Sequence, residues 1–349
     1  MKRKNTSSIM SILICAILLS SYLYFAKADE SKIIKHPQSV YSVRFSSDGK
    51  YLAIAGGQSI LLYDMESNRI VKRWDPNFWI YAIDFAPNGE EIAVGGFSMD
   101  IPIYKINTVK RPSKRLNSDT IGFLDFSPDG KWLAARSMSK PITTVFGLTS
   151  DKKITLKNLA GLSSWPPPRI LFSPNGKLFA AAGNPVVIWE VESWREIAKI
   201  GGTDRSIAFS ATSLTLAQGT LNGNGEIIFW NTSTGKERLS FQSERIKNSI
   251  YIEFSPGGHY LAVAGGQNVA SIIEIWNIKK ERVIKVLEGH TGPITTLDFS
   301  MDGKWLASGS YDQTVRLWDI SPIADPSPKS VDTGTDKIAT TWGQMKSAL

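Results

Sequence analysis

Cysteine and histidine, on which many catalytic and metal sites depend, are scarce in this sequence. Among 349 residues there are one cysteine, Cys15, and three histidines, His36, His259 and His290. Because Cys15 lies in an N-terminal segment that is predicted to be removed, the rest of the chain has no disulfide, thiolate nucleophile or sulfur-ligated metal. No two histidines stand at the spacing of a metal-ligand pair. These absences predict a protein that is not an enzyme and that holds no metal or cofactor.

Positive charge is also less abundant than the whole-chain balance suggests. The sequence has 40 lysines and arginines against 32 acidic residues, a net charge of +8. Four of the basic residues, Lys2, Arg3, Lys4 and Lys27, lie in the N-terminal segment, so the remaining 36 leave a net charge of +4. This charge is scattered, which argues against a nucleic-acid partner. The densest cluster, residues 110–115, is expected to be a solvated edge, with an acidic partner as the alternative.

The N-terminal segment has the three parts of an export signal. Lys2-Arg3-Lys4 is a positive region, residues 9–25 are apolar, and Ala26-Lys27-Ala28 is an A-x-A cleavage site. Residues 1–28 are therefore predicted to be a signal peptide, and the protein is expected in the periplasm, at the cell surface or secreted. A chain without cysteine after export favours a bacterial source. The alternative is an uncleaved segment that anchors the protein in a membrane through residues 9–25.

The remainder of the chain is built from seven similar units. Each unit has an apolar segment ending in phenylalanine, a short turn and a second apolar segment, as in FSPDGKWLA at 126–134. The phenylalanines, which we call the anchor phenylalanines, recur every 37 to 46 residues: Phe45, Phe85, Phe126, Phe172, Phe209, Phe254 and Phe299. That spacing leaves room for about four short strands in each unit. The sequence therefore predicts an array of β units.

The strands and turns can be placed within one unit. In the first unit the predicted strands cover residues 40–45, 51–57, 59–64 and 68–74, which are rich in β-branched and aromatic residues. The turn after the anchor phenylalanine reads Ser-Pro-Asp-Gly in its fullest form, in which glycine takes a positive φ. Each unit is therefore expected to be a small antiparallel sheet.

The last unit carries motifs that resemble those of a WD repeat, the unit of a β-propeller blade. They are Leu287-Glu-Gly-His290, Phe299-Ser-Met-Asp-Gly303 and Trp318-Asp319. The resemblance covers residues 32–320 and implies one all-β domain, a single seven-bladed β-propeller of four-stranded antiparallel blades. Residues 321–349 are expected to form a flexible C-terminal tail.

The resemblance also implies a structural role for four polar and aromatic side chains. In WD repeats a histidine, a serine or threonine, an aspartate and a tryptophan form a hydrogen-bonded tetrad, and only the last unit matches fully, with His290, Ser308, Asp312 and Trp318. We favour this reading over a hydrolase triad. The other six blades are expected to depend on apolar stacking against their neighbours.

The chain ends suggest how the ring closes. Residues after 320 have no strand pattern, so the last unit lacks its own fourth strand. Residues 32–36 align with residues 285–290, and His36 and His290 each stand nine residues before an anchor phenylalanine. The N-terminal strand is therefore predicted to complete the last blade, which leaves no long unpaired edge.

A partner site is expected on the narrower face, around the central channel, as the resemblance implies. Partner-contacting positions there include the residues four and six before each anchor phenylalanine, together with the turns between second and third strands. The candidate partner-binding residues are Tyr41, Trp79, Tyr81, Phe97, Met138, Trp165, Arg205 and Tyr311. Aromatic residues and arginine carry much of the binding energy at interfaces. The leading prediction is a monomeric, extracytoplasmic, non-catalytic scaffold that binds proteins or peptides.

The second prediction is an enzyme, or a binder of a small ligand or metal, that uses the central channel. It would need charged groups converging at that channel. The acids to consider stand directly before four anchor phenylalanines: Asp84, Asp125, Glu253 and Asp298. Strand alternation places them opposite the phenylalanines, and another strand end is expected to line the channel, so this prediction ranks second.

Overall fold

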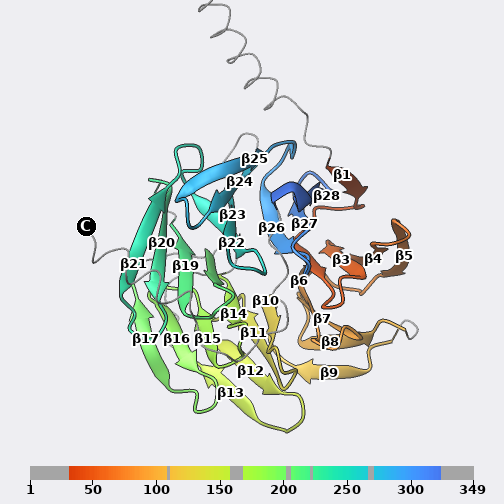
Figure 1. The fold of residues 1–349 in the computed structure, drawn as a ribbon. Helices are drawn as coiled ribbons and strands as arrows, with labels where there is room; N and C mark the ends of the chain where they lie inside the picture. The colour runs from red at the N-terminus through yellow and green to blue at the C-terminus, as the bar shows by residue number, and fades with distance from the viewer. Residues whose placement is uncertain are drawn as a thin grey trace, which may run out of the picture.

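The chain folds as a ring of seven antiparallel sheets, each with four strands (Figure 1). The computed structural model describes residues 31–107, 111–157, 168–201, 206–220, 223–265 and 271–323, without the side chains of Ser249 and Ile250. In these residues no helix has the length and apolar character to cross a membrane. The predicted signal peptide lies outside the described residues. The predicted all-β, seven-bladed propeller is confirmed.

The strands follow one order in the first six blades. Blades 1 to 3 contain β2 (Ser42–Phe45), β3 (Tyr51–Gly56), β4 (Ser59–Asp64) and β5 (Arg69–Trp74); β6 (Ile80–Phe85), β7 (Glu91–Gly96), β8 (Asp100–Lys105) and β9 (Lys114–Asn117); and β10 (Ile121–Phe126), β11 (Trp132–Ser137), β12 (Thr143–Gly147) and β13 (Lys153–Leu156). Blades 4 to 6 contain β14 (Ile170–Phe172), β15 (Leu178–Ala181), β16 (Val186–Glu190) and β17 (Glu196–Ile200); β18 (Ser206–Phe209), β19 (Thr215–Gly219), β20 (Glu226–Asn231) and β21 (Glu237–Gln242); and β22 (Ser249–Phe254), β23 (Tyr260–Gly265), β24 (Ile272–Asn277) and β25 (Arg282–Leu287).

Blade 7 is assembled from both ends of the chain. It contains β26 (Ile294–Phe299), β27 (Trp305–Ser310), β28 (Thr314–Asp319) and the N-terminal strand β1 (Lys32–Lys35). Strand β1 pairs antiparallel with β28, with Ile34 opposite Val315, and Figure 1 shows the two side by side. The predicted closure is therefore confirmed. Residues 321–323, assigned to the tail from the sequence, form a short 3-10 helix.

Seven buried apolar clusters lie at the seven interfaces between neighbouring blades. The cluster between blades 1 and 2, for example, joins Ile60 and Leu62 to Ile83 and Phe85. The others occupy the corresponding places around the ring. Because a single blade has no core of its own, each blade is stabilised mainly by the apolar surface that its two neighbours cover.

The repeated turn after each anchor phenylalanine is held by its own side chains. In blade 1 the Ser46 hydroxyl donates to Asp48 at 2.5 Å and accepts the backbone N–H of Tyr51 at 2.9 Å. Gly49 then takes a φ of 70°. In blade 5 the same place is filled by Ser213, with a φ of 63°. The turn therefore keeps its backbone shape even where glycine is absent.

In blade 7 the four tetrad side chains form one hydrogen-bonded chain. The His290 ring contacts Asp312 Oδ2 through Nδ1 and Ser308 Oγ through Nε2, both at 2.8 Å. Ser308 Oγ also accepts Trp318 Nε1–H at 2.8 Å. Burial lowers the pKa of His290, although hydrogen bonding to Asp312 acts in the opposite direction. A neutral imidazole therefore sits inside the blade, where its contacts are structural.

Two other blades satisfy their tryptophan N–H groups with different acceptors. In blade 5 Trp230 Nε1 donates to Gln218 Oε1 at 2.6 Å. In blade 6 Trp276 Nε1 donates to Glu274 Oε2 at 3.0 Å. The expectation that these blades depend on apolar stacking is therefore incomplete, since a buried N–H left without an acceptor would cost roughly 1–3 kcal/mol.

Truncating Ile34 should reveal how much the closing strand contributes. Ile34 is 6% exposed and packs in the cluster between blades 7 and 1, whereas its neighbour Ile33 is 50% exposed. Ile34→Ala should lower the free energy of unfolding by about 2–5 kcal/mol, and Ile33→Ala by less than about 0.5 kcal/mol. Urea denaturation measures both. Equally small losses of unfolding free energy in both variants would contradict a stabilising role for the β1–β28 pairing.

Candidate functional site

Four of the predicted partner-binding residues form a continuous row of rings at the mouth of the channel. Tyr311 of blade 7 meets Tyr41 of blade 1 with ring centroids 5.8 Å apart. Tyr41 meets Tyr81 of blade 2 at 5.1 Å, and Tyr81 meets Phe97 at 5.3 Å. All three contacts are edge-on, the arrangement that aromatic pairs prefer. The ring closure therefore places side chains from the end and the start of the chain in one row.

Trp79 extends this row toward solvent. Its carbonyl oxygen accepts the backbone N–H of Phe97 at 2.8 Å, which fixes the two residues side by side. Trp79 is 43% exposed and Phe97 is 53% exposed. We call Tyr41, Trp79, Tyr81, Phe97 and Tyr311 the aromatic rim. Its two outer members leave much of their apolar surface in water.

The remaining predicted residues are placed differently. Met138 is half-buried in the β11–β12 turn, one blade beyond Phe97, and its N–H donates to Thr120 O at 2.9 Å. Trp165 and Arg205 lie outside the described residues. Met99, 71% exposed in the β7–β8 turn, was not predicted. It follows Phe97 by two residues, so the same turn position could have identified it.

The first strands of the blades surround the central channel, and the four acids lie there. Asp298 accepts the backbone N–H of Phe45 at 2.6 Å, and Asp84 accepts that of Phe126 at 2.7 Å. Asp125 accepts that of Phe172 at 2.6 Å. With Glu253 these acids line a cavity of about 270 Å³, which we call the lower cavity. The expectation that another strand end lines the channel is therefore wrong.

Bulges in the first strands change which way the residues ahead of the acids face. The pairing of β10 with β11 shifts by one residue between Ile121 and Phe123, and similar shifts occur in β6, β22 and β26. An extra residue in a strand resets the alternation of its side chains. Ile121 and Leu124 can thus both face the blade interface, while Phe123 and Asp125 face the channel.

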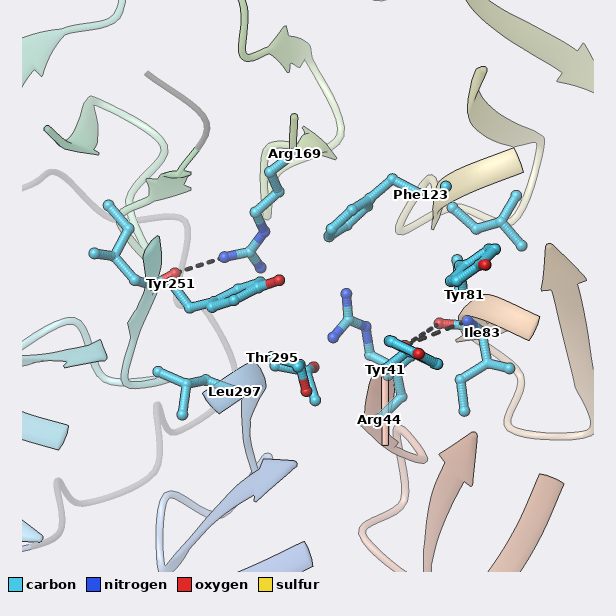
Figure 2. Close-up of a pocket in the computed structure, with 15 residues that line it drawn as sticks. Tyr41, Arg44, Tyr81, Ile83, Phe123, Arg169, Tyr251, Thr295 and Leu297 are labelled. Atoms are coloured by element: carbon cyan, nitrogen blue, oxygen red, sulfur yellow. Dashed lines mark hydrogen bonds between the residues drawn. The ribbon is translucent and has the colours of Figure 1, made fainter. Parts of the chain in front are cut away.

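Two arginines not predicted from the sequence line the channel from different blades. Arg44 of blade 1 lies 3.4 Å from Asp84, measured from Nε to Oδ1. Arg169 enters from blade 4, donates to Ile252 O at 2.6 Å and pairs with Glu253 of blade 6. Figure 2 shows both guanidinium groups pointing into the channel from opposite sides. We call them the arginine pair. Arg44 could have been found from the sequence, because it stands directly before Phe45, the position that holds an acid in four other blades.

Burial controls the charge of the acids. It raises the pKa of Asp298 to about 7 and that of Asp84 to about 6, although Arg44 opposes both shifts. Burial also raises the pKa of Asp125 well above its usual value, and the neighbouring Asp84 adds to that shift. Throughout the described residues no group of three or more His, Cys, Asp or Glu side chains is arranged to hold a metal ion.

The raised pKa of Asp298 predicts a stability that falls as pH rises. Between about pH 4 and pH 7 the unfolded chain releases this proton while the folded protein keeps it, so stability is lost over that window. Asp298→Asn keeps an oxygen for the Phe45 N–H but cannot ionise. Between pH 5 and pH 8 the wild type should lose roughly 2 kcal/mol more than the variant. Urea titrations at both pH values measure this, and equal losses would contradict a buried, protonated Asp298.

Comparison with known proteins identifies repeats in the first and last parts of the chain segment that forms the ring. The family model described as WD domain, G-beta repeat, matches residues 30–64 and 281–319. A 102-residue segment is 35% identical to the Periodic tryptophan protein 2 homolog of Schizosaccharomyces pombe, covering 28% of this chain and 11% of that protein.

Two plant proteins match over longer stretches. The WD repeat-containing protein WDS homolog of Arabidopsis thaliana is 26% identical over 59% of this chain and 39% of its own length. Pre-mRNA-processing factor 19 of Oryza sativa is 25% identical over 68% of this chain and 46% of its own length.

The chain thus spans less than half the length of these curated relatives. They come from a fungus and two plants, so they give no support to the expected bacterial source. The matched segments contain all four strands of blade 7, the first three strands of blade 1 and the outer strand β25 of blade 6. By its fold and these repeats, the chain is a seven-bladed β-propeller that carries WD40 repeats.

Proposed function

We propose that this protein is a non-catalytic scaffold that binds a protein or peptide partner through the aromatic rim. The observation that carries the proposal is the row of rings across blades 7, 1 and 2 at the channel mouth. Large aromatic side chains bury much area at little cost in side-chain entropy, so they dominate the binding energy of interfaces.

The packing of the rim supports this role. Tyr41, Tyr81 and Tyr311 are only partly exposed and contact one another, so their positions are fixed before any partner binds. Preorganised side chains lose less entropy on binding. Trp79 and Phe97, at the outer end, are the large apolar groups left accessible. Contiguous exposed apolar surface of this kind is typical of interaction sites.

We further propose that the protein works outside the cytoplasm, as a monomer. The basis for the location is the sequence of residues 1–28, with its basic start, apolar centre and A-x-A site. A membrane anchor through residues 9–25 is the alternative. N-terminal sequencing of the protein from its native compartment distinguishes them, because cleavage gives a chain that starts at Asp29. The modest net charge of +4 after cleavage, 36 basic against 32 acidic residues, favours a partner other than nucleic acid.

Truncating Trp79 should weaken partner binding without unfolding the protein. Trp79→Ala and Phe97→Ala should each lower partner affinity by roughly tenfold or more, because each removes an exposed aromatic ring of the rim. Ile70→Ala is the matched control, since Ile70 is 47% exposed on the outer strand β5, away from the rim. Partners captured by wild type from the native compartment are identified, and calorimetry then measures their affinities.

Two results would contradict this proposal. One is partner capture by Trp79→Ala and Phe97→Ala that equals capture by wild type. The other is a fall in the melting temperature of these variants that is large enough to explain their loss of partner capture. That result would mean that the two rings belong to the core.

A further inference from the structure

The channel changes its chemistry from one end to the other. Directly beneath Tyr41 and Tyr81 lies a small cavity of about 30 Å³, which we call the upper cavity. Its described lining includes both guanidinium groups of the arginine pair and contains no carboxylate. All four acids line the lower cavity, on the other side of the arginine pair. The arginine pair is therefore a partition whose upper face presents positive charge to the channel mouth.

The walls above the arginine pair are aromatic and hydroxylic. Tyr41, Tyr81, Phe123 and Tyr251 surround the opening, as Figure 2 shows. The Phe123 ring lies 5.8 Å from the Arg44 guanidinium carbon, a distance at which ring and cation attract. Thr295 lines the same space, but its hydroxyl donates to the backbone at Val40 O. The cationic groups that a ligand meets on entering from the rim are therefore the two guanidinium groups, each of which also pairs with an acid of the lower cavity.

Arg169 has unused hydrogen-bonding capacity. Its Nε atom is buried and has no hydrogen-bond partner among the described residues, although Nη1 and Nη2 bind Ile252 O and Glu253. A buried donor without an acceptor is unfavourable by roughly 1–3 kcal/mol. An acceptor that reached Nε from the upper cavity, which Arg169 lines, would relieve this cost.

A second buried group without a hydrogen-bond partner, the Ser206 hydroxyl, could take over the hydrogen bond that Arg169 now donates to Ile252 O. In blade 1 the Ser42 hydroxyl donates to Ile83 O of the next blade at 3.4 Å. Ser206 is the matching residue of blade 5, and Ile252 is the matching residue of blade 6. Arg169 occupies Ile252 O, and the Ser206 hydroxyl, 1% exposed, is left without a partner among the described residues. If Arg169 turned toward a ligand, Ser206 could donate to Ile252 O in its place.

We propose that the upper cavity binds a carboxylate group of the partner peptide, held between Arg44 and Arg169. The cavity of about 30 Å³ has room for about two water-sized groups, which suits the two oxygens of a carboxylate better than the four of a phosphate. Guanidinium groups bind carboxylates through paired hydrogen bonds. The inference rests on the proposed function, because the rim above the cavity would hold the rest of the peptide.

Benzoate tests the site without knowledge of the partner. Its ring suits the aromatic mouth and its carboxylate suits the arginine pair, while benzamide has the same shape without charge. Binding to the full chain is measured by saturation-transfer NMR and calorimetry. We expect millimolar binding of benzoate, at least about tenfold weaker binding of benzamide, since a hydrogen bond to a charged group is stronger than a neutral one, and no competition by inorganic phosphate.

Variants locate the binding. Arg169→Gln should weaken benzoate binding by about tenfold or more, while Arg245→Gln, which removes an exposed arginine that pairs with Glu288 and lines neither cavity, should not change it. Because Arg169→Gln leaves Glu253 without its partner, folding is checked by its melting curve. In wild type, the ¹⁵Nε signal of Arg169 should shift on adding benzoate, which keeps the test independent of the variant's stability.

Peptides distinguish the source of the carboxylate. An acetylated Gly-Phe-Gly peptide with a free C-terminus is compared with its amide and with amidated Gly-Phe-Glu-Gly. Preference for the first assigns a chain terminus, and preference for the last assigns an acidic side chain. Equal binding of benzoate and benzamide, or an Arg169 signal that does not move, would overturn the proposal. Partner capture that depends on Trp79 while benzoate fails to bind would leave the scaffold role standing and remove only the carboxylate site.

Discussion

Burial of apolar surface between neighbouring blades is the interaction on which the rest of this structure depends. No blade has a core of its own; each of the seven apolar clusters contains residues of two blades. A ring satisfies this requirement for every blade only if it closes, and here β1 closes it by pairing with β28. Closure is therefore the condition for stability. It also brings Tyr311 against Tyr41, 270 residues away along the chain, so the stability of the ring and the assembly of the rim have the same origin.

The same crowding shapes the channel. Seven first strands converge on one axis, and polar side chains there lose most of their contact with water, which is why burial raises the pKa of Asp84, Asp125 and Asp298. Each of these three acids accepts a backbone N–H group of the next blade, so they connect neighbouring blades around the axis. The arginine pair offsets part of their charge and divides the channel into an acidic lower part and a cationic upper part.

Differences between the blades, more than their common features, point to the function. The anchor phenylalanines and the turns that follow them recur because every blade needs them for packing. The residues three to six positions before the anchor phenylalanines differ between blades, and several of them face the channel or its mouth. In blades 1 and 2 they include the aromatic residues Tyr41, Trp79 and Tyr81, and in blade 4 they include Arg169, which reaches across to blade 6. A uniform scaffold thus carries a site on one part of its face.

By itself the sequence determined the number of blades, the strand order and the closure. The period of the anchor phenylalanines and the matching places of His36 and His290 follow from local requirements that each blade repeats. It also identified the residues of the rim, because they stand at fixed places in the repeat. Tyr41, Trp79 and Tyr81 precede an anchor phenylalanine by four or six residues, and Phe97 and Tyr311 lie in the turn between second and third strands. Only the tertiary structure decided which side chains line the channel. Counting residues correctly placed the acids on the strand face opposite the anchor phenylalanines, but only the ring shows that this face of the first strands lines the channel. Arg169 and Glu253, 84 residues apart, meet because the ring brings two non-adjacent blades to one axis, a proximity that no local pattern in the chain encodes.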